Sequence, residues 1–131
     1  MYVLMEKMKF YVIIFNTQTL KVEAEVVEYK TNRDDIYDKL CMLLNCDSLE
    51  FVDYSEDIVI IVDENGKFKP NNPVFNVITQ DGYSVELAGK IIFARNIENE
   101  HSTDIGSIKY EDIFNLRTQL QIQLIGVTKG E

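Results

Sequence analysis

A succession of short runs rich in β-branched and aromatic residues, separated by turn-forming residues, constrains the fold of this chain more than any other feature. The first run, FYVIIFN at 10–16, precedes the turn sequence NTQT and the run LKVEAEVVEY at 20–29, which together predict a β-hairpin. The dipeptide Asp81-Gly82, a strong hairpin signal, separates two further runs. The predicted strands lie at 10–16, 20–29, 48–54, 57–63, 72–80, 83–89, 90–96 and 119–127.

Side-chain alternation predicts how two of these strands are buried. In the second strand Val22, Ala24 and Val26 alternate with Glu23 and Glu25, so we expect the apolar side chains to face the core and the glutamates to face water. The run DIVIIVD is apolar almost throughout, which is typical of a strand in the interior of a sheet. The chain should therefore contain both edge and interior strands.

Two segments change to helical periodicity. The first predicts a helix from Arg33 to Leu44, with Thr31 or Asn32 able to cap its start. Its apolar face holds Ile36, Leu40, Leu43 and Leu44. A shorter helix is predicted around KYEDIFNLR, and the polar segment Asn96–Ser107 between the last two predicted strands is predicted to be an exposed loop. The expected fold is α+β, a mainly antiparallel sheet with one longer helix and one short C-terminal helix, in a single domain over residues 1–131.

Composition and charge exclude several classes of function. The chain has 22 acidic against 13 basic residues, a formal charge of -9, and no run of three basic residues, which argues against a duplex nucleic acid partner. Its apolar runs are far shorter than the roughly 20 residues that cross a bilayer, and its N-terminus lacks the pattern of a secretory signal, so we expect no membrane partner. The predicted location is the cytoplasm.

The sequence contains no recognisable catalytic or metal-binding motif. Cys41 and Cys46 are the two cysteines and His101 is the single histidine, too few ligands for a structural zinc site, and no disulfide framework is expected. No phosphate-binding glycine loop, nucleophile elbow or HExxH sequence occurs. We therefore expect no catalytic residue, no metal and no cofactor, and a protein that is not an enzyme.

Arginine is scarce, since only Arg33, Arg95 and Arg117 occur. Phe93 and Arg95 are two residues apart on a predicted strand, so both side chains should point to one face and present an aromatic ring and a guanidinium group to a base and a phosphate. Asn96 adds an amide. The alternative is that Phe93 belongs to the core and Arg95 ends the strand with its head in water. The predicted ligand-binding residues are Phe93, Arg95, Asn96, Arg33 and Arg117.

Three sequence segments carry a family resemblance: DIVIIVDENGKFKPNNPVFN, LAGKIIFARN and DIGSIKYEDI. Together they resemble a family of small domains of unknown function common in phages and mobile elements of Firmicutes, over residues 10–126. The chain also shows a weaker similarity to anti-Thoeris proteins, which act as sponges, proteins that bind and hold a signal molecule. This similarity implies binding of a cyclic ADP-ribose variant or cyclic oligonucleotide without turnover.

Three functions follow as expectations. The first, implied by the similarity, is a phage anti-defence protein that binds and sequesters a nucleotide-derived immune signal in the cytoplasm of the host cell. The second is an acidic DNA mimic or protein–protein inhibitor of a host defence enzyme, and the third is a structural accessory domain. A sponge needs a concave site with convergent cations, whereas a mimic needs carboxylates arrayed on an exposed face. We also expect a homo-oligomer, because several strands are apolar on both faces.

Overall fold

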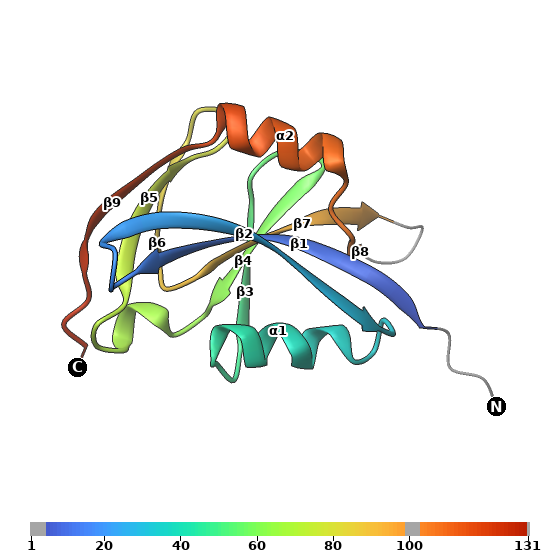
Figure 1. Cartoon of the computed structure of the whole chain (residues 1–131), viewed down its shortest axis with the longest axis horizontal. Coiled ribbons are helices and arrows are strands. Elements are labelled where there is room, and N and C mark those ends of the chain that lie inside the picture. The colour runs from blue at the N-terminus through green and yellow to red at the C-terminus, as the bar shows by residue number, and fades with distance from the viewer. Residues whose placement is uncertain (1–4, 99–102, 131) are drawn as a thin grey trace.

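The computed structural model describes residues 5–98 and 103–130, which form strands, two α-helices and one short 3-10 turn (Figure 1). The helices are α1 (Ile36–Leu44) and α2 (Tyr110–Gln119), and the 3-10 turn is η1 (Gly66–Phe68). The strands are β1 (Glu6–Asn16), β2 (Lys21–Thr31), β3 (Leu49–Asp53), β4 (Ile58–Asp63), β5 (Pro73–Ile78), β6 (Ser84–Ala88), β7 (Ile91–Glu98), β8 (Thr103–Gly106) and β9 (Gln121–Val127).

The strands form two antiparallel sheets. The larger sheet has the order β2-β1-β7-β4-β3, with β8 also paired to β7, and the smaller sheet has the order β6-β5-β9. Helix α1 packs on one face of the larger sheet, and the smaller sheet and α2 cover the other face (Figure 1). The inner strands β1, β7 and β4 are therefore buried on both faces over much of their length, as their apolar sequences require.

Alternation along the inner strands divides the core into two parts. On β1, Phe10 and Val12 face α1, whereas Tyr11 and Ile13 face the smaller sheet. Strand β7 repeats this division, because Ile92 and Ala94 lie in the α1 part whereas Ile91 and Phe93 lie in the other. Each interior strand thus supplies side chains to both parts of the core.

The predicted α+β fold and its antiparallel hairpins are confirmed. Strands β1 and β2 pair over their whole length, and β5 and β6 pair across the predicted Asp81-Gly82 turn. The run predicted to be interior is β4, which is buried at every position. Leu120, Ile122 and Leu124 are partly buried, as the alternation before and along β9 predicted.

The predicted burial of Val22, Ala24 and Val26 in β2 is wrong. Val22 and Val26 are each 41% exposed, and Ala24 between them is exposed as well. These residues lie opposite Phe15, Tyr11 and Ile13 of β1, on the side that faces the smaller sheet. Strand β2 lies at one edge of the larger sheet, and the core between the two sheets contains no residue of β2. The cover provided by the smaller sheet therefore ends before it reaches β2.

The helix boundaries also differ from the prediction. Helix α1 begins at Ile36 rather than Arg33, because the Asn32 Oδ1 atom accepts hydrogen bonds from the backbone N–H groups of Asp34 and Asp35 and forms a turn first. The two helices have 9 and 10 residues, so the expected contrast between a longer helix and a short C-terminal one is not found.

The segment 96–107 is largely a hairpin rather than the predicted exposed loop. Strand β7 continues to Glu98 and β8 pairs with it from Thr103 to Gly106. Residues 99–102, including His101, lie outside the described residues. The segment was predicted to be a loop because it is polar, as Asn96 and Asp104 illustrate. Strands pair through backbone hydrogen bonds, however, and these can form whatever the polarity of the side chains. No helix within 5–98 and 103–130 is long and apolar enough to span a bilayer.

The position of Phe93 predicts its contribution to stability. Its side chain is 0% exposed, and its ring centroid lies 5.6 Å from that of Tyr54 and 6.1 Å from that of Tyr11. We expect Phe93→Ala to lower the free energy of unfolding by about 3 to 5 kcal/mol, measured by urea denaturation. The control Phe68→Ala, at a side chain that is 59% exposed, should change it by less than about 0.5 kcal/mol. Equal effects of the two substitutions would contradict this packing.

Candidate functional site

A groove of about 460 Å³ lies on the α1 side of the larger sheet, and we call it the α1 groove. Tyr37, in the first turn of α1, forms one wall, and Val59 of β4 and Asn96 of β7 come from the adjoining strands. Its volume falls within the roughly 300 to 1,000 Å³ typical of small-molecule sites. The groove is lined by Tyr37, Phe51, Asp53, Val59, Asn96, Glu98, Asp104 and Ile105.

Two aromatic rings form the apolar part of the groove. The rings of Tyr37 and Phe51 meet edge to face, with centroids 6.5 Å apart and an interplanar angle of 69°. Phe51 is 47% exposed, so part of its ring is available for contact with a ligand. Such rings offer a surface on which a planar heterocycle can stack.

Asp104 organises the polar wall. It accepts hydrogen bonds from the Tyr37 hydroxyl, from Arg33 Nη1 at 3.2 Å and from the Ile105 backbone N–H at 2.8 Å. Arg33 Nη1 also donates to the Ile105 carbonyl at 2.9 Å, and Arg33 Nε lies 3.4 Å from Glu6 Oε1. Arg33 is thus fixed beside the groove by contacts to β1 and β8.

These contacts shift two pKa values in opposite directions. Burial, followed by the hydrogen bond to Asp104, raises the pKa of Tyr37 to about 12. Burial tends to raise the pKa of Asp104, but the hydrogen bonds from Tyr37, the Ile105 backbone and Arg33 outweigh it, and the pKa is lowered from 3.8. At neutral pH the pair is therefore a protonated phenol that donates to a carboxylate.

The remaining polar side chains determine which ligands the groove can accept. Asn96 contributes an amide, which both donates and accepts hydrogen bonds, as the edge of a nucleobase requires. Asp53, Glu98 and Asp104 contribute carboxylates, which accept hydrogen bonds from hydroxyl or amino groups. The groove is therefore suited to a planar ligand rich in donors, with Arg33 as a neighbouring contact for an anion.

The structure brings together only two of the five residues predicted from sequence. Asn96 lines the α1 groove, and Arg33 is hydrogen-bonded to Asp104 in its wall. Phe93 is fully buried on the other face of the sheet, so it presents no ring surface to a ligand and the predicted shared face with Arg95 is part of the core. Arg117 is exposed in the last turn of α2, on that same other side of the sheet.

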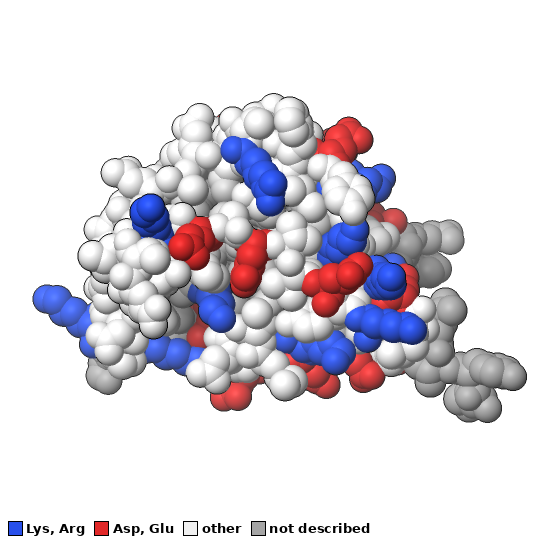
Figure 2. Space-filling view, in the orientation of Figure 1, with Lys and Arg blue, Asp and Glu red and all other residues white. Residues whose placement is uncertain are grey.

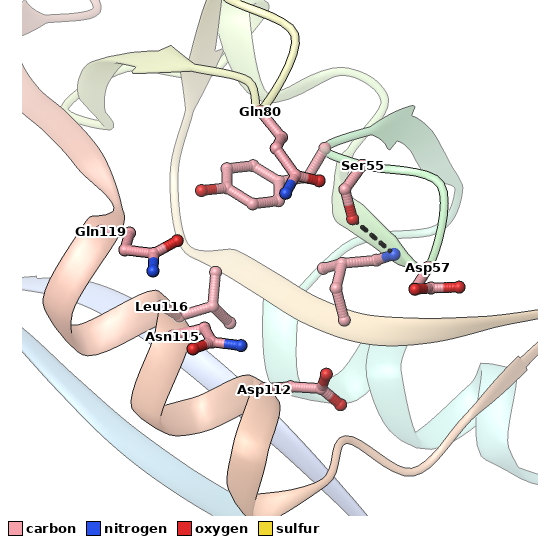
Figure 3. Close-up of a pocket in the computed structure, with 9 residues that line it drawn as sticks. Ser55, Asp57, Gln80, Asp112, Asn115, Leu116 and Gln119 are labelled. Atoms are coloured by element: carbon pink, nitrogen blue, oxygen red, sulfur yellow. Dashed lines mark hydrogen bonds between the residues drawn. The ribbon is translucent and has the colours of Figure 1, made fainter.

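Arg95 is held in an ion pair with α2. Its Nε atom lies 3.3 Å from Asp112 Oδ2, and the two side chains are 21% and 12% exposed. Asp112 lines a polar cleft with Asn115, Leu116 and Gln119 of α2 and with Ser55, Asp57 and Gln80 from two loops (Figure 3). The cleft measures only about 120 Å³, too little for a nucleotide. The contact points to a role for Arg95 in joining α2 to the sheet.

Sequence reasoning missed Tyr37, Phe51 and Asp104. Tyr37 is an aromatic residue off the apolar face of its helix, which is a weak signal by itself. Asp104 belongs to the segment predicted to be a loop, and a loop prediction assigns it no partner, whereas the structure pairs it with Ile97 in a hairpin. Within the described ranges, no group of three or more potential metal ligands is brought together.

The raised pKa of Tyr37 makes stability sensitive to alkaline pH. The pKa of Tyr37 in the folded protein is about 12 and exceeds the reference value of 10.0. The contribution of the protonated Tyr37 to stability is therefore fully present below pH 10 and is lost as the pH rises toward 12. We expect the unfolding free energy of the wild type to fall more steeply over this range than that of Tyr37→Phe, measured by urea denaturation at several pH values. Tyr83→Phe, at a tyrosine that is 71% exposed, is the matched control and should follow the wild type. Identical pH dependence in Tyr37→Phe and wild type would contradict this linkage.

Comparison with known proteins assigns the chain to a family. No curated protein and no solved structure shows a significant match to the chain. A family model described as a domain of unknown function, DUF3846, matches residues 8–115, which include every residue that lines the α1 groove and also Arg33. Because the match covers most of the chain, from β1 into α2, the protein belongs to the DUF3846 family.

Proposed function

We propose that this protein binds and sequesters a nucleotide-derived ligand without turnover, with a base and ribose in the α1 groove and a phosphate near Arg33. The observation that carries the proposal is the combination of aromatic rings, an amide and carboxylates in one groove of about 460 Å³. The rings and the amide suit a base, and the carboxylates suit the hydroxyl groups of a ribose.

The base is assigned to the aromatic part of the groove. Stacking of a base on an aromatic side chain contributes roughly 1 to 3 kcal/mol, and Phe51 has ring surface exposed to solvent. Asn96 lies in the same groove and can pair with the hydrogen-bonding edge of the base. Stacking then supplies affinity and the amide supplies selectivity between bases.

The ribose is assigned to the carboxylates. Ribose hydroxyls are donors, and Asp53 and Glu98 are acceptors when ionised. The same negative charges disfavour a phosphate deep in the groove, because like charges repel. A phosphate is therefore better placed at Arg33, whose side chain is 46% exposed.

Arg33 can contact an anion without giving up its present partners. Its contacts with the described residues use Nε and Nη1, which leaves the Nη2 hydrogens for a phosphate oxygen. Asp104 and Glu6 reduce the net positive charge at this place. The phosphate contact should consequently be weaker than one made by an unpaired arginine.

The biological role that fits this binding is anti-defence in the cytoplasm of a host cell. The resemblance to phage domains and the weaker similarity to anti-Thoeris sponges support it, and they favour a cyclic ADP-ribose variant or a cyclic oligonucleotide as the sequestered signal. Such molecules combine bases, riboses and phosphates, which are the three groups assigned to the groove and its rim.

A second candidate is a protein–protein inhibitor that offers carboxylates to a basic partner. Asp53, Glu56, Asp57 and Asp81 gather around the loop between β3 and β4, and the first, second and fourth of them line a hollow of about 600 Å³ to which no lysine or arginine contributes. The face shown in Figure 2 carries lysines and arginines mixed with acidic residues, so it does not resemble a phosphate array. This candidate is therefore confined to the end of the molecule near that loop.

Ligand titrations with matched variants test the location of the site. Calorimetry with a panel of nucleosides, cyclic dinucleotides and cyclic ADP-ribose isomers should identify a ligand whose affinity falls about 5- to 150-fold in Phe51→Ala, as loss of stacking requires. Arg33→Ala should weaken phosphorylated ligands more than the parent nucleosides. The control Arg95→Ala, an arginine on the other face of the sheet, should bind as the wild type does. A loss of affinity in Arg95→Ala with none in Phe51→Ala would place the site elsewhere.

Sequestration without turnover has its own test. The ligand identified by calorimetry is incubated with excess protein, the protein is denatured by heat, and the released material is separated by chromatography. We expect the ligand to be recovered unchanged after any incubation time. Products that accumulate with time, and that do so in proportion to protein concentration, would show that the protein is an enzyme.

A further inference from the structure

The C-terminal end of α1 brings the two cysteines of the chain together. Asn45, just beyond the helix, has the left-handed angles φ 52° and ψ 55°. The Cys46 N–H donates to the Cys41 carbonyl at 3.0 Å, and the Asn45 N–H donates to the Met42 carbonyl at 3.2 Å. These two nested hydrogen bonds define a Schellman motif.

The motif determines which side chains meet. In a Schellman motif, the residue two positions past the helix end commonly packs on the residue five positions before it. Those two positions are occupied here by Cys46 and Cys41, and the neighbouring Cys41 side chain contributes, after burial, to the raised pKa of Cys46. Both side chains are partly exposed, so a small reagent can reach them.

An ion pair holds this end of the helix in place. Lys69 Nζ donates to the Asn45 carbonyl at 3.2 Å and lies 2.6 Å from Asp63 Oδ2, at the end of β4. Asn45 is the residue between the helix and Cys46, so this contact fixes the backbone that positions the second thiol. The Schellman motif and the Lys69 contacts therefore fix the backbone that carries both cysteines.

We propose that Cys41 and Cys46 form a reversible disulfide by exchange with a low-molecular-weight disulfide. One thiolate attacks the small disulfide, forms a mixed disulfide with it and releases one small thiol. The second cysteine loses its proton and displaces the other small thiol, which closes the Cys41–Cys46 bond. In sum, two cysteine thiols are oxidised and one small disulfide is reduced to two thiols.

The surroundings make this exchange slow at neutral pH. Burial, followed by the negative charge of a Cys41 thiolate, raises the pKa of Cys46 to about 11, and the thiolate is the reactive form. Closure of the bond should accordingly accelerate as the pH increases. The pair lies at the end of α1 opposite Tyr37, so its oxidation can be followed without a ligand in the α1 groove.

Oxidised glutathione and intact mass spectrometry under non-reducing conditions test the proposal on the full chain. We expect the wild type to lose two hydrogen atoms and to carry no glutathione, at a rate that increases between about pH 7 and 9, and to revert with dithiothreitol. Cys41→Ser and Cys46→Ser, the matched controls, should each retain one glutathione because no second thiol displaces it. Two stable adducts on the wild type, bonds only between separate chains, or no reaction would overturn the proposal.

Discussion

Burial of the inner strands of the larger sheet on both faces is the constraint on which the rest of the structure depends. Strand β7 lies between β1 and β4, and its alternate side chains enter the two parts of the core. Ile92 and Ala94 belong to the part under α1, whereas Ile91 and Phe93 belong to the part on the opposite face, under the smaller sheet. Each face needs a cover because both are apolar. Helix α1 covers only part of its face of the sheet, and the α1 groove lies on that face next to the N-terminal turn of the helix.

Local sequence patterns predicted most of the strands and both helices because those patterns act over a few residues. The β5–β6 hairpin depends on Asp81-Gly82, and the burial of β4 depends on a continuous apolar run. The exposure of Val22 depends instead on where the smaller sheet ends. That boundary is set by packing between distant segments, so no pattern within β2 reports it.

The same distinction applies to the candidate site. Spacing correctly implied that Phe93 and Arg95 share one face of β7, but only the packing of α2 shows that this face is covered and that Asp112 meets Arg95. Asn96 points to the opposite face and reaches the groove. Its neighbours there come from α1, β3 and β8, and a prediction from adjacent residues could not have assembled them.

Helix α1 is attached to the rest of the protein near both of its ends. Near its start, Tyr37 and Arg33 hold Asp104 of β8, and just past its end, Lys69 joins Asn45 to Asp63. A helix tied in this way resists the hinge motion by which many binding proteins close over a ligand. The α1 groove is accordingly preorganised for the ligand that we propose for it: binding would cost little conformational entropy, and the contacts themselves, rather than the opening of a lid, would govern the lifetime of that complex.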